Sequence, residues 1–313
     1  MLTVFIKIAV IFSIIAIGYI ANKTKILPYE SNQYLVKLML VITTPFMILS
    51  SISSKTLTDE TLKQTTEVII GSLIFFFAAA AVAYVIVKCL KYEPKCDRGI
   101  LMVVITGVNT GFMGFPITKA IFGDEYFFLM VIENIVLTVY LYSIAVFQMN
   151  IGNEKKQKLS SIFKPLANMC TFAAIIGIVL LFTGTKLPEP ILDLATMMGD
   201  ATIPISMLVV GIQLGQSDLK KIIKNGKLIF CSLCNVILIP LLTYLVVNPL
   251  SITDATKVIL VFAAAFPSAV VTVAVASKEG KNAGLMAEGV ALTTLFSLFT
   301  LPLFAMFLLS RYC

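Results

Sequence analysis

The sequence predicts an all-α polytopic membrane protein with ten transmembrane helices, organised as two inverted repeats of five helices. Three observations carry this prediction: an apolar composition, ten apolar runs of bilayer-crossing length, and proline motifs that recur in the second half of the chain. In the predicted fold, the fourth and ninth helices are both broken near the middle of the membrane and cross there.

The composition is the first observation. Of the 313 residues, 58% are hydrophobic and 13% are charged, and the mean hydropathy is +0.97. Soluble domains contain about 45–50% apolar and about 25% charged residues. Because a single globular core cannot bury this excess, the sequence predicts that lipid surrounds most of the chain.

The length of the apolar runs is the second observation. A helix that spans a bilayer needs about 20 mostly apolar residues. The run Leu2–Ala21 is too long for a signal peptide and has no small-residue cleavage site, so we expect it to remain as a helix. The ten predicted helices are 2–21, 34–53, 67–90, 99–122, 126–149, 163–183, 191–214, 227–247, 256–277 and 283–309.

The basic residues predict the orientation of these helices, because Lys and Arg are retained on the cytoplasmic side. With the N-terminus outside, 17 of the 24 Lys and Arg residues fall on inside loops. We therefore expect a multi-pass protein of the plasma membrane with both termini outside. The net charge of +7 then reflects topology and requires no nucleic-acid partner.

The internal repeat is the third observation. The motif Thr43–Leu49 shares Thr, Pro and Leu with Thr202–Leu208 at an offset of 159, which aligns Pro45 with Pro204. The dipeptide Phe-Pro at Pro116 recurs at Pro267 at an offset of 151. The alternative is a chance alignment of proline kinks. If the repeat is real, helices 2 and 4 correspond to helices 7 and 9, and each half contains five helices.

Because five is an odd number, the second half is then inverted in the membrane, an arrangement found in many secondary transporters. The predicted domains are a first repeat at residues 1–150, a short cytoplasmic loop at 151–162, and an inverted second repeat at 163–313.

The sequence GVNTGFMGFPI at 107–117 predicts the break in helix 4. Glycine and proline both weaken a helix, and freed backbone groups are tolerated in a membrane only where protein or water satisfies them. We expect Pro116 to begin a second half-helix. The sequence AAAFPSAVVTVA at 263–274 repeats this arrangement around Pro267 and Ser268. The predicted break or hinge residues are Pro45, Gly107, Gly114 and Pro204.

Two half-helix N-termini near the centre of the membrane would favour an anion such as a carboxylate. Asn109 and Thr110 would add side-chain donors and acceptors. Simpler alternatives remain at this stage: Asn109 caps a kink, or Ser268 bonds back to its own helix.

Carboxyl groups inside a membrane are costly and commonly functional. Glu133, beside Asn134 in helix 5, and Asp200, four residues before Pro204, are the candidates for coupling to a proton or sodium ion. The alternative for Glu133 is a structural pairing. Glu288 near a helix end and Asp193 at the interface are weaker candidates, as are Gln213 and Asn235 as polar lining.

The chain contains no histidine, which excludes HExxH zinc sites, Ser–His dyads and histidine proton relays. The Cys231–Cys234 pair lies in an apolar run without a second pair, so we expect packing residues rather than a disulfide or metal site. We therefore predict no metal, no cofactor and no enzymatic activity.

The segment NTGFMGFPI (109–117) resembles the Asn-x-Gly-x-x-Gly-x-Pro pattern of the auxin efflux carrier family, the relatives of plant PIN transporters. The segment AAAFPSAVVTVAVASKEGKNAGLMAEGVALTTLFSLFTLPL (263–303) resembles that family's ninth and tenth helices. The resemblance covers the whole chain. It differs from plant PINs at Val108, where they have Pro before Asn, and at Phe266, where they have Asn before Pro, and it lacks their long central loop.

The resemblance implies a fold like that of NhaA and bile-acid transporters and an elevator-type secondary transporter for a small organic anion, such as malate or an auxin-like acid. It implies these substrate-binding residues: Asn109, Thr110, Gly111, Pro116, Pro267, Ser268 and Ala269. A channel or a lipid or bile-acid-like carrier of related fold is the alternative. Besides the anion and the lipid bilayer, a proton or sodium ion and a second copy in a homodimer stay open as partners.

Overall fold

The structure is a computed structural model that describes residues 2–53, 55–151, 167–216 and 224–312. These residues form helices joined by short connections, and an isolated bridge between Val108 and Ser268 is the one β-type pairing among them. The predicted cytoplasmic loop 151–162 lies outside the described residues except for its first residue. The all-helical class predicted from the sequence is confirmed.

Helices long and apolar enough to cross a membrane account for most of the predicted spans. Six such helices lie in the described part of the chain: Glu30–Ser53, Asp59–Leu90, Asp124–Met149, Glu189–Gln216, Gly226–Val247 and Ala283–Tyr312. Ala9–Lys23 and Met169–Thr183 are shorter apolar helices. The two remaining predicted spans, 99–122 and 256–277, are each divided into two helices.

The chain divides into two compact units, each built from three separate segments. Unit 1 contains Met1–Thr66, Gly111–Ile132 and Leu166–Gln216, and unit 2 contains Glu67–Thr110, Glu133–Pro165 and Ser217–Cys313. The divisions fall within helix α4 (Asp59–Leu90), at the break in predicted helix 4, and within helix α7 (Asp124–Tyr142). The two units are defined by contacts within the fold and not by repeated structure. The predicted repeats 1–150 and 163–313 therefore stay a prediction.

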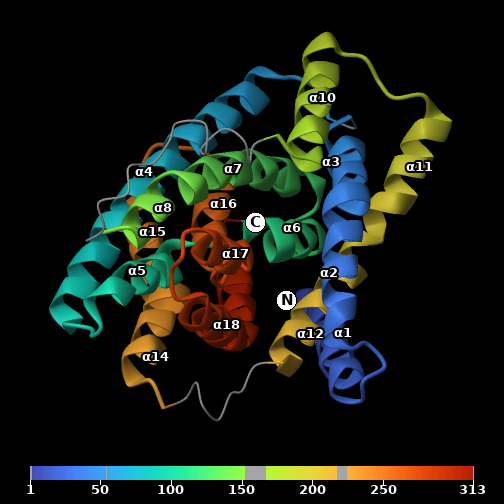
Figure 1. Cartoon of the computed structure of the whole chain (residues 1–313). Helices are drawn as coiled ribbons and strands as arrows, with labels where there is room; N and C mark the ends of the chain where they lie inside the picture. The colour runs from blue at the N-terminus through green and yellow to red at the C-terminus, as the bar shows by residue number, and fades with distance from the viewer. Residues whose placement is uncertain (1, 54, 152–166, 217–223, 313) are drawn as a thin grey trace. The chain divides into compact units, whose positions relative to one another are not determined.

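Unit 1 is held together by close helix pairs. Helix α1 (Leu2–Lys23) packs along α12 (Thr202–Gln216), and α3 (Thr44–Ser53) packs against α10 (Met169–Thr183) and α11 (Glu189–Asp200), as Figure 1 shows. Glycines allow this proximity: a Cβ atom on Gly211 would overlap Ile15 O, and one on Gly199 would lie 2.7 Å from Met47 Cα. Unit 1 also contains α2 (Tyr29–Leu38) and α6 (Phe115–Phe122).

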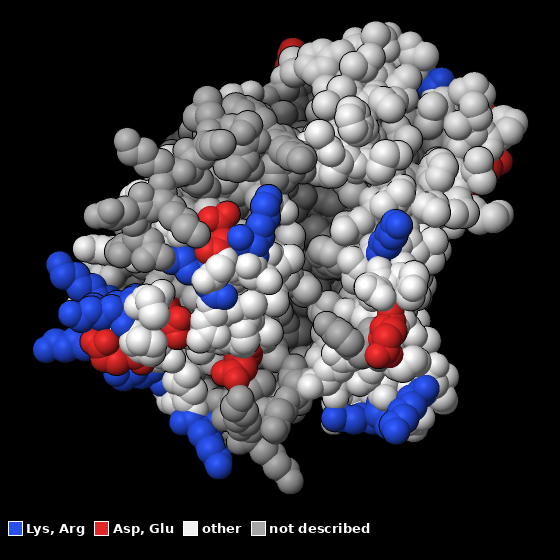
Figure 2. Space-filling view, in the orientation of Figure 1, with Lys and Arg blue, Asp and Glu red and all other residues white. Residues whose placement is uncertain are grey.

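Unit 2 is centred on α18 (Ala283–Tyr312), which contacts α5 (Arg98–Thr106), α14 (Gly226–Leu233), α16 (Asp254–Ala264) and α17 (Val271–Lys278). Helix α5 also packs on α8 (Ile144–Met149), and α15 (Ile239–Val247) packs on α16. Gly289 on α18 fits against the Val104 side chain, where a Cβ atom would overlap. The charged side chains of this unit include a basic group at the turn from α4 to α5, where Lys88, Lys91 and Lys95 are exposed (Figure 2).

In the described part of the chain, three helices contain a π-helical turn that ends two residues before a proline. The turns η1 (Met39–Thr43), η3 (Thr110–Gly114) and η5 (Cys234–Leu238) precede Pro45, Pro116 and Pro240 respectively. Proline lacks an N–H group and its ring crowds the carbonyl one turn earlier. A π turn widens the helix locally and is frequent at functional positions. The prolines therefore lie in the first turn of the helices that follow, and α3, α6 and α15 begin one residue before them.

Candidate functional site

The break in predicted helix 4 follows the α5 segment. Helix α5 ends at Thr106, residues 107–109 are not helical, and η3 begins at Thr110. The Gly107 N–H closes the last turn by donating to Val103 O at 2.8 Å. Helix α6 then starts at Phe115 with Pro116 in its first turn. A second half-helix therefore follows the break as predicted, but its helical conformation begins at Thr110 with η3, and Pro116 lies in the first turn of its α-helical part.

In predicted helix 9, the non-helical segment extends further after Pro267 than before it. Helix α16 ends at Ala264, and α17 begins only at Val271, four residues after Pro267. Proline disfavours the α conformation in the residue before it, which here is the buried Phe266. Pro267 therefore lies in a non-helical segment, whereas Pro116 lies in a helix start.

Within unit 2 the two breaks lie against each other. Val108 and Ser268 form an antiparallel bridge, and the Ala269 N–H donates to Gly107 O. The backbone groups that each break frees are thus partly satisfied by the other break, as the low polarity of a membrane requires. Two segments about 160 residues apart in the chain form one pairing.

Ser268 bonds to two helices, α5 and α18. Its hydroxyl donates to Val104 O on α5, and its N–H donates to the Thr293 hydroxyl on α18 at 3.1 Å. Thr293 in turn donates to the Gly289 carbonyl of its own helix at 2.9 Å. The alternative that Ser268 bonds back to its own helix is wrong, because the extended segment directs its side chain toward α5.

The side chains around the paired breaks are buried. Asn109 is 2% exposed, Thr110 and Ser268 are fully buried, and Ala269 is 3% exposed. The Thr110 hydroxyl accepts a hydrogen bond from Asn134 Nδ2 at 2.9 Å, which ties α7 to the residue after Asn109. Neutral donors and acceptors therefore surround the bridge, and residues 104–116 and 263–277 contain no Lys or Arg.

Other predicted site and hinge residues lie in unit 1. Gly111 follows Thr110 in η3 and is partly exposed, Gly114 ends η3, and Pro116 is buried in α6. Pro45 lies in the first turn of α3 and Pro204 in the first turn of α12, after a short interruption at Ala201. The structure thus places all of these residues at helix starts or breaks.

Glu133 on α7 is fully buried in unit 2. The Thr110 hydroxyl lies beside its carboxyl group. Neither carboxyl oxygen has a partner at hydrogen-bonding geometry in the described part of the chain. No charged partner acts on this carboxyl group, and the choice between a structural pairing and a coupling role for Glu133 stays a prediction.

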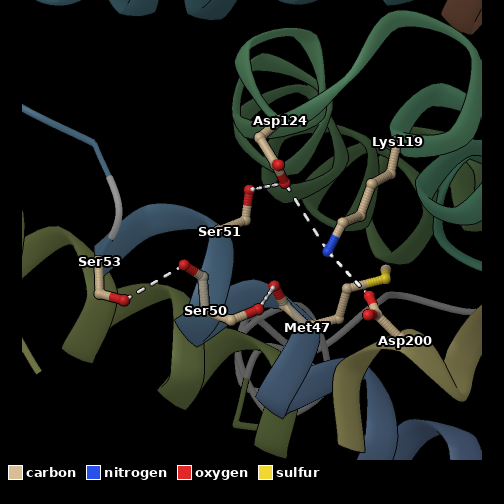
Figure 3. Close-up of polar contacts among 7 residues, drawn as sticks. All are labelled: Met47, Ser50, Ser51, Ser53, Lys119, Asp124 and Asp200. Atoms are coloured by element: carbon tan, nitrogen blue, oxygen red, sulfur yellow. Dashed lines mark hydrogen bonds and ion pairs between the residues drawn. The ribbon is translucent and has the colours of Figure 1, made fainter. Parts of the chain in front are cut away.

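Asp200 has a different environment, shown in Figure 3. Lys119 Nζ on α6 pairs with Asp200 Oδ1 at 3.4 Å and with Asp124 Oδ1 at 3.7 Å. Asp124 also accepts from the Ser51 hydroxyl at 3.0 Å. The Asp200 side chain is 59% exposed. Asp200 therefore belongs to unit 1, where it shares Lys119 with Asp124, whereas Glu133 belongs to unit 2.

The weaker candidates fall in varied positions. Asp193 is exposed on α11, and Glu288 and Gln213 are partly exposed. Asn235 is fully buried in η5, where its Nδ2 donates to Ile105 O at 2.9 Å, next to the break. In the sequence, the position of Asn235 is marked by the proline five residues after it.

Sequence reasoning missed a second buried polar group in unit 2. The Tyr140 hydroxyl hydrogen-bonds the Thr106 hydroxyl at 2.6 Å and Gln148 Oε1 at 3.0 Å. The Tyr140 ring stacks on the Phe76 ring with the two ring centroids 4.6 Å apart. These residues come from α4, α5, α7 and α8, so no local pattern in the sequence could have joined them.

Comparison with known proteins gives a consistent result over nearly the whole chain. The family described as membrane transport protein matches residues 3–305. An uncharacterized transporter of Methanocaldococcus jannaschii is 25% identical over 311 residues, covering 97% of this chain and 98% of the relative. An uncharacterized transporter of Methanothermobacter thermautotrophicus is 24% identical over 301 residues, covering 94% and 95%. The chain is a multi-pass membrane protein of the membrane transport protein family, which is the auxin efflux carrier family that its sequence resembles, and it is a transporter rather than an enzyme.

Proposed function

We propose that this transporter is a secondary carrier that moves a small organic anion, a carboxylate such as malate or an auxin-like acid, across the plasma membrane. The observation that supports this most is the pairing of the two breaks through Val108 and Ser268. It gathers neutral donors and acceptors from two distant segments in the buried interior of unit 2.

The chemistry of these groups suits an anion that must be released again. A lysine or arginine at the breaks would hold a carboxylate strongly, and none is present in 104–116 or 263–277. Backbone N–H groups and the side chains of Asn109 and Thr110 would bind it by hydrogen bonds and dipoles, and Ser268, through its bonds to Val104 and Thr293, would hold the break in place. Pro267 and Ala269 would shape the same surface. The part of Gly111 and Pro116 in binding stays a prediction.

The set of helices in each of the two units supports ten spans in an inverted 5+5 repeat. Unit 1 takes the first two helices of each predicted half, and unit 2 takes most of the other three. Predicted helix 1 packs on helix 7, and predicted helix 2 packs on helix 6. In a 5+5 repeat, helix 1 corresponds to helix 6 and helix 2 corresponds to helix 7. If the two halves are exchanged, the pair of helices 1 and 7 becomes the pair of helices 6 and 2, as a repeat with pseudo-two-fold symmetry requires.

For the mechanism, we propose elevator-type alternating access in which unit 2 carries the anion and moves relative to unit 1. Motions of whole units are the usual form of alternating access in inverted-repeat carriers. Both termini would lie outside the cell, as the distribution of Lys and Arg indicates.

Exchange across proteoliposomes tests this function. Vesicles preloaded with one unlabelled acid from a panel that includes malate and indole-3-acetate are mixed with the same labelled acid outside. We expect saturable exchange of at least one acid, and its loss in Asn109→Ala and Pro267→Ala. Ser72→Ala is the matched control, because Ser72 is fully buried in the same unit on α4.

Normal exchange in both purified, folded site variants would contradict the site assignment. Ohmic single-channel currents instead of saturable exchange would favour a channel. Transfer of labelled phospholipid between leaflets, with no exchange of any acid, would favour a lipid carrier.

A further inference from the structure

The carboxyl group of Glu133 is the buried ionisable group that the proposed anion site does not use. It is fully buried in unit 2, its one polar neighbour is the Thr110 hydroxyl, and neither of its oxygens meets hydrogen-bonding geometry with a described residue. An isolated carboxylate in an apolar interior is very unfavourable, and such a group takes up a proton instead. Its neutral form is compatible with this position, whereas its charged form requires water or a cation.

No positive charge acts on the Glu133 carboxyl group. Helices α4, α5 and α8 meet α7 at Tyr140, and their parts in unit 2 carry three charged residues, Glu67, Lys88 and Arg98. All three are engaged elsewhere: Glu67 accepts from Thr253 and Thr256, Lys88 lies over the Tyr84 ring, and Arg98 pairs with Glu93. The segment 107–110 contains no charged residue.

Two further observations favour a proton over a metal ion as the species that neutralises Glu133. The described residues contain no group of three or more His, Cys, Asp or Glu side chains that could hold a metal. The titratable residue nearest along the same stretch of α7 is Tyr140, whose hydroxyl is already bonded to Thr106 and Gln148. Glu133 thus stands as a single acid, and a single acid can carry one proton.

Glu133 is also linked to the proposed anion site through its neighbour. Asn134 donates to the Thr110 hydroxyl at 2.9 Å, and Thr110 follows Asn109 and begins the π turn η3. Thr110 also lies beside the Glu133 carboxyl group. A negative charge on Glu133 would therefore repel an anion bound at the paired breaks, because like charges in a low-dielectric interior interact strongly.

From this geometry we propose that Glu133 is the proton carrier of the transporter, and that an anion binds at the paired breaks only when Glu133 is protonated. The proposal rests on the proposed function, because it couples a proton to that same anion site. Glu133 takes a proton from water on one side of the membrane, forming its O–H bond. It returns the proton to water on the other side when the anion leaves, so one proton and one anion move in the same direction.

Glu133→Gln tests this coupling, because the amide imitates the neutral acid but cannot release a proton. In proteoliposomes with an inward proton gradient, we expect the wild type to accumulate the labelled acid that it exchanges. The variant should keep anion exchange at equal concentrations and lose proton-driven accumulation completely. Asp200→Asn is the matched control, because that carboxylate is exposed and paired with Lys119, and it should accumulate the acid normally.

Accumulation by Glu133→Gln equal to that of the wild type would overturn the proposal, as would accumulation driven by a sodium gradient and not by protons. Infrared difference spectroscopy of the detergent-solubilised protein gives a readout without any acid substrate. We expect the C=O stretch of a protonated buried carboxyl group in the wild type and in Asp200→Asn, and its absence in Glu133→Gln. If no acid is exchanged by the wild type, the proposed function fails while this band still decides the state of Glu133; a wild type without the band would contradict the proposal.

Discussion

At the scale of single residues, the interior of unit 2 is unusual for the number of hydroxyl and amide groups that it buries. Thr106, Thr110, Ser268 and Thr293 are all fully buried, and each bonds to a helix carbonyl, a backbone N–H or another side chain. In an apolar surrounding each such group is stable only with its partner, because an unsatisfied polar group there is costly. The buried polar residues therefore hold the unit in one arrangement.

Tyr140 provides a test of this view. Tyr140→Phe removes the hydroxyl that bonds Thr106 and Gln148 but keeps the ring that stacks on Phe76. Leaving buried partners unsatisfied costs about 1–3 kcal/mol, so we expect a lower unfolding temperature in detergent. Tyr84→Phe on α4 is the control, because Tyr84 is 46% exposed, and it should unfold like the wild type. Equal temperatures for both variants would contradict a stabilising role of the hydroxyl.

The residue scale is also where prediction from sequence was least complete. Asn109, Thr110 and Ser268 could be selected because they stand beside glycines and prolines in apolar runs. The partners of Ser268 could not, since Val104 and Thr293 are separated from it by 164 and 25 residues. Glu133 was selected by its charge alone, and only the structure places Asn134 against Thr110.

At the scale of helices, two devices recur. A π turn directly precedes each of α3, α6 and α15, and each of these helices has a proline in its first turn. Pro302, in contrast, lies inside α18, and that helix continues without interruption. Glycines bring helix backbones together in unit 1, most closely between α1 and α12. Small residues are the usual means of close packing in membranes, because lipid provides no hydrophobic force between helices.

Gly211 tests the second device. In Gly211→Ala the new methyl group would overlap Ile15 O and approach Tyr19 N, so α1 and α12 must separate. Loss of packing and overlap in a close-packed interface cost about 1–3 kcal/mol. We expect earlier thermal unfolding than for the wild type. Gly226→Ala is the control, because nothing lies within 4 Å of its added Cβ atom. Unchanged unfolding of Gly211→Ala would mean that the two helices adjust without strain.

At the scale of the whole molecule, the order of helices along the chain and their grouping into units differ. Each unit collects segments from both halves of the sequence, and the chain passes from one unit to the other inside α4 and α7. The orientation of the chain in the membrane is the property of the whole molecule that is tested most directly.

Cysteine labelling tests that orientation. Cys96 lies in the basic turn before α5, which the distribution of Lys and Arg assigns to the cytoplasm. With the other cysteines replaced by serine, a membrane-impermeant maleimide should label Cys96 only after cell lysis. A cysteine introduced at Thr185, with Cys96 also replaced, should be labelled on intact cells. The reverse pattern would place both termini inside.

The sequence by itself determined the membrane class, the helical intervals, the two broken helices and the family, because hydropathy, proline and glycine act locally and leave a readable pattern. It also pointed to Glu133, since a carboxyl group in an apolar run is conspicuous. Only the tertiary structure decided that the breaks pair through Val108 and Ser268, that Lys119 pairs with Asp200, and that Thr110 and no positive charge lies beside Glu133. These facts depend on contacts between distant segments, and such contacts are selected by packing and by the need to satisfy buried polar groups, not by neighbours in the chain.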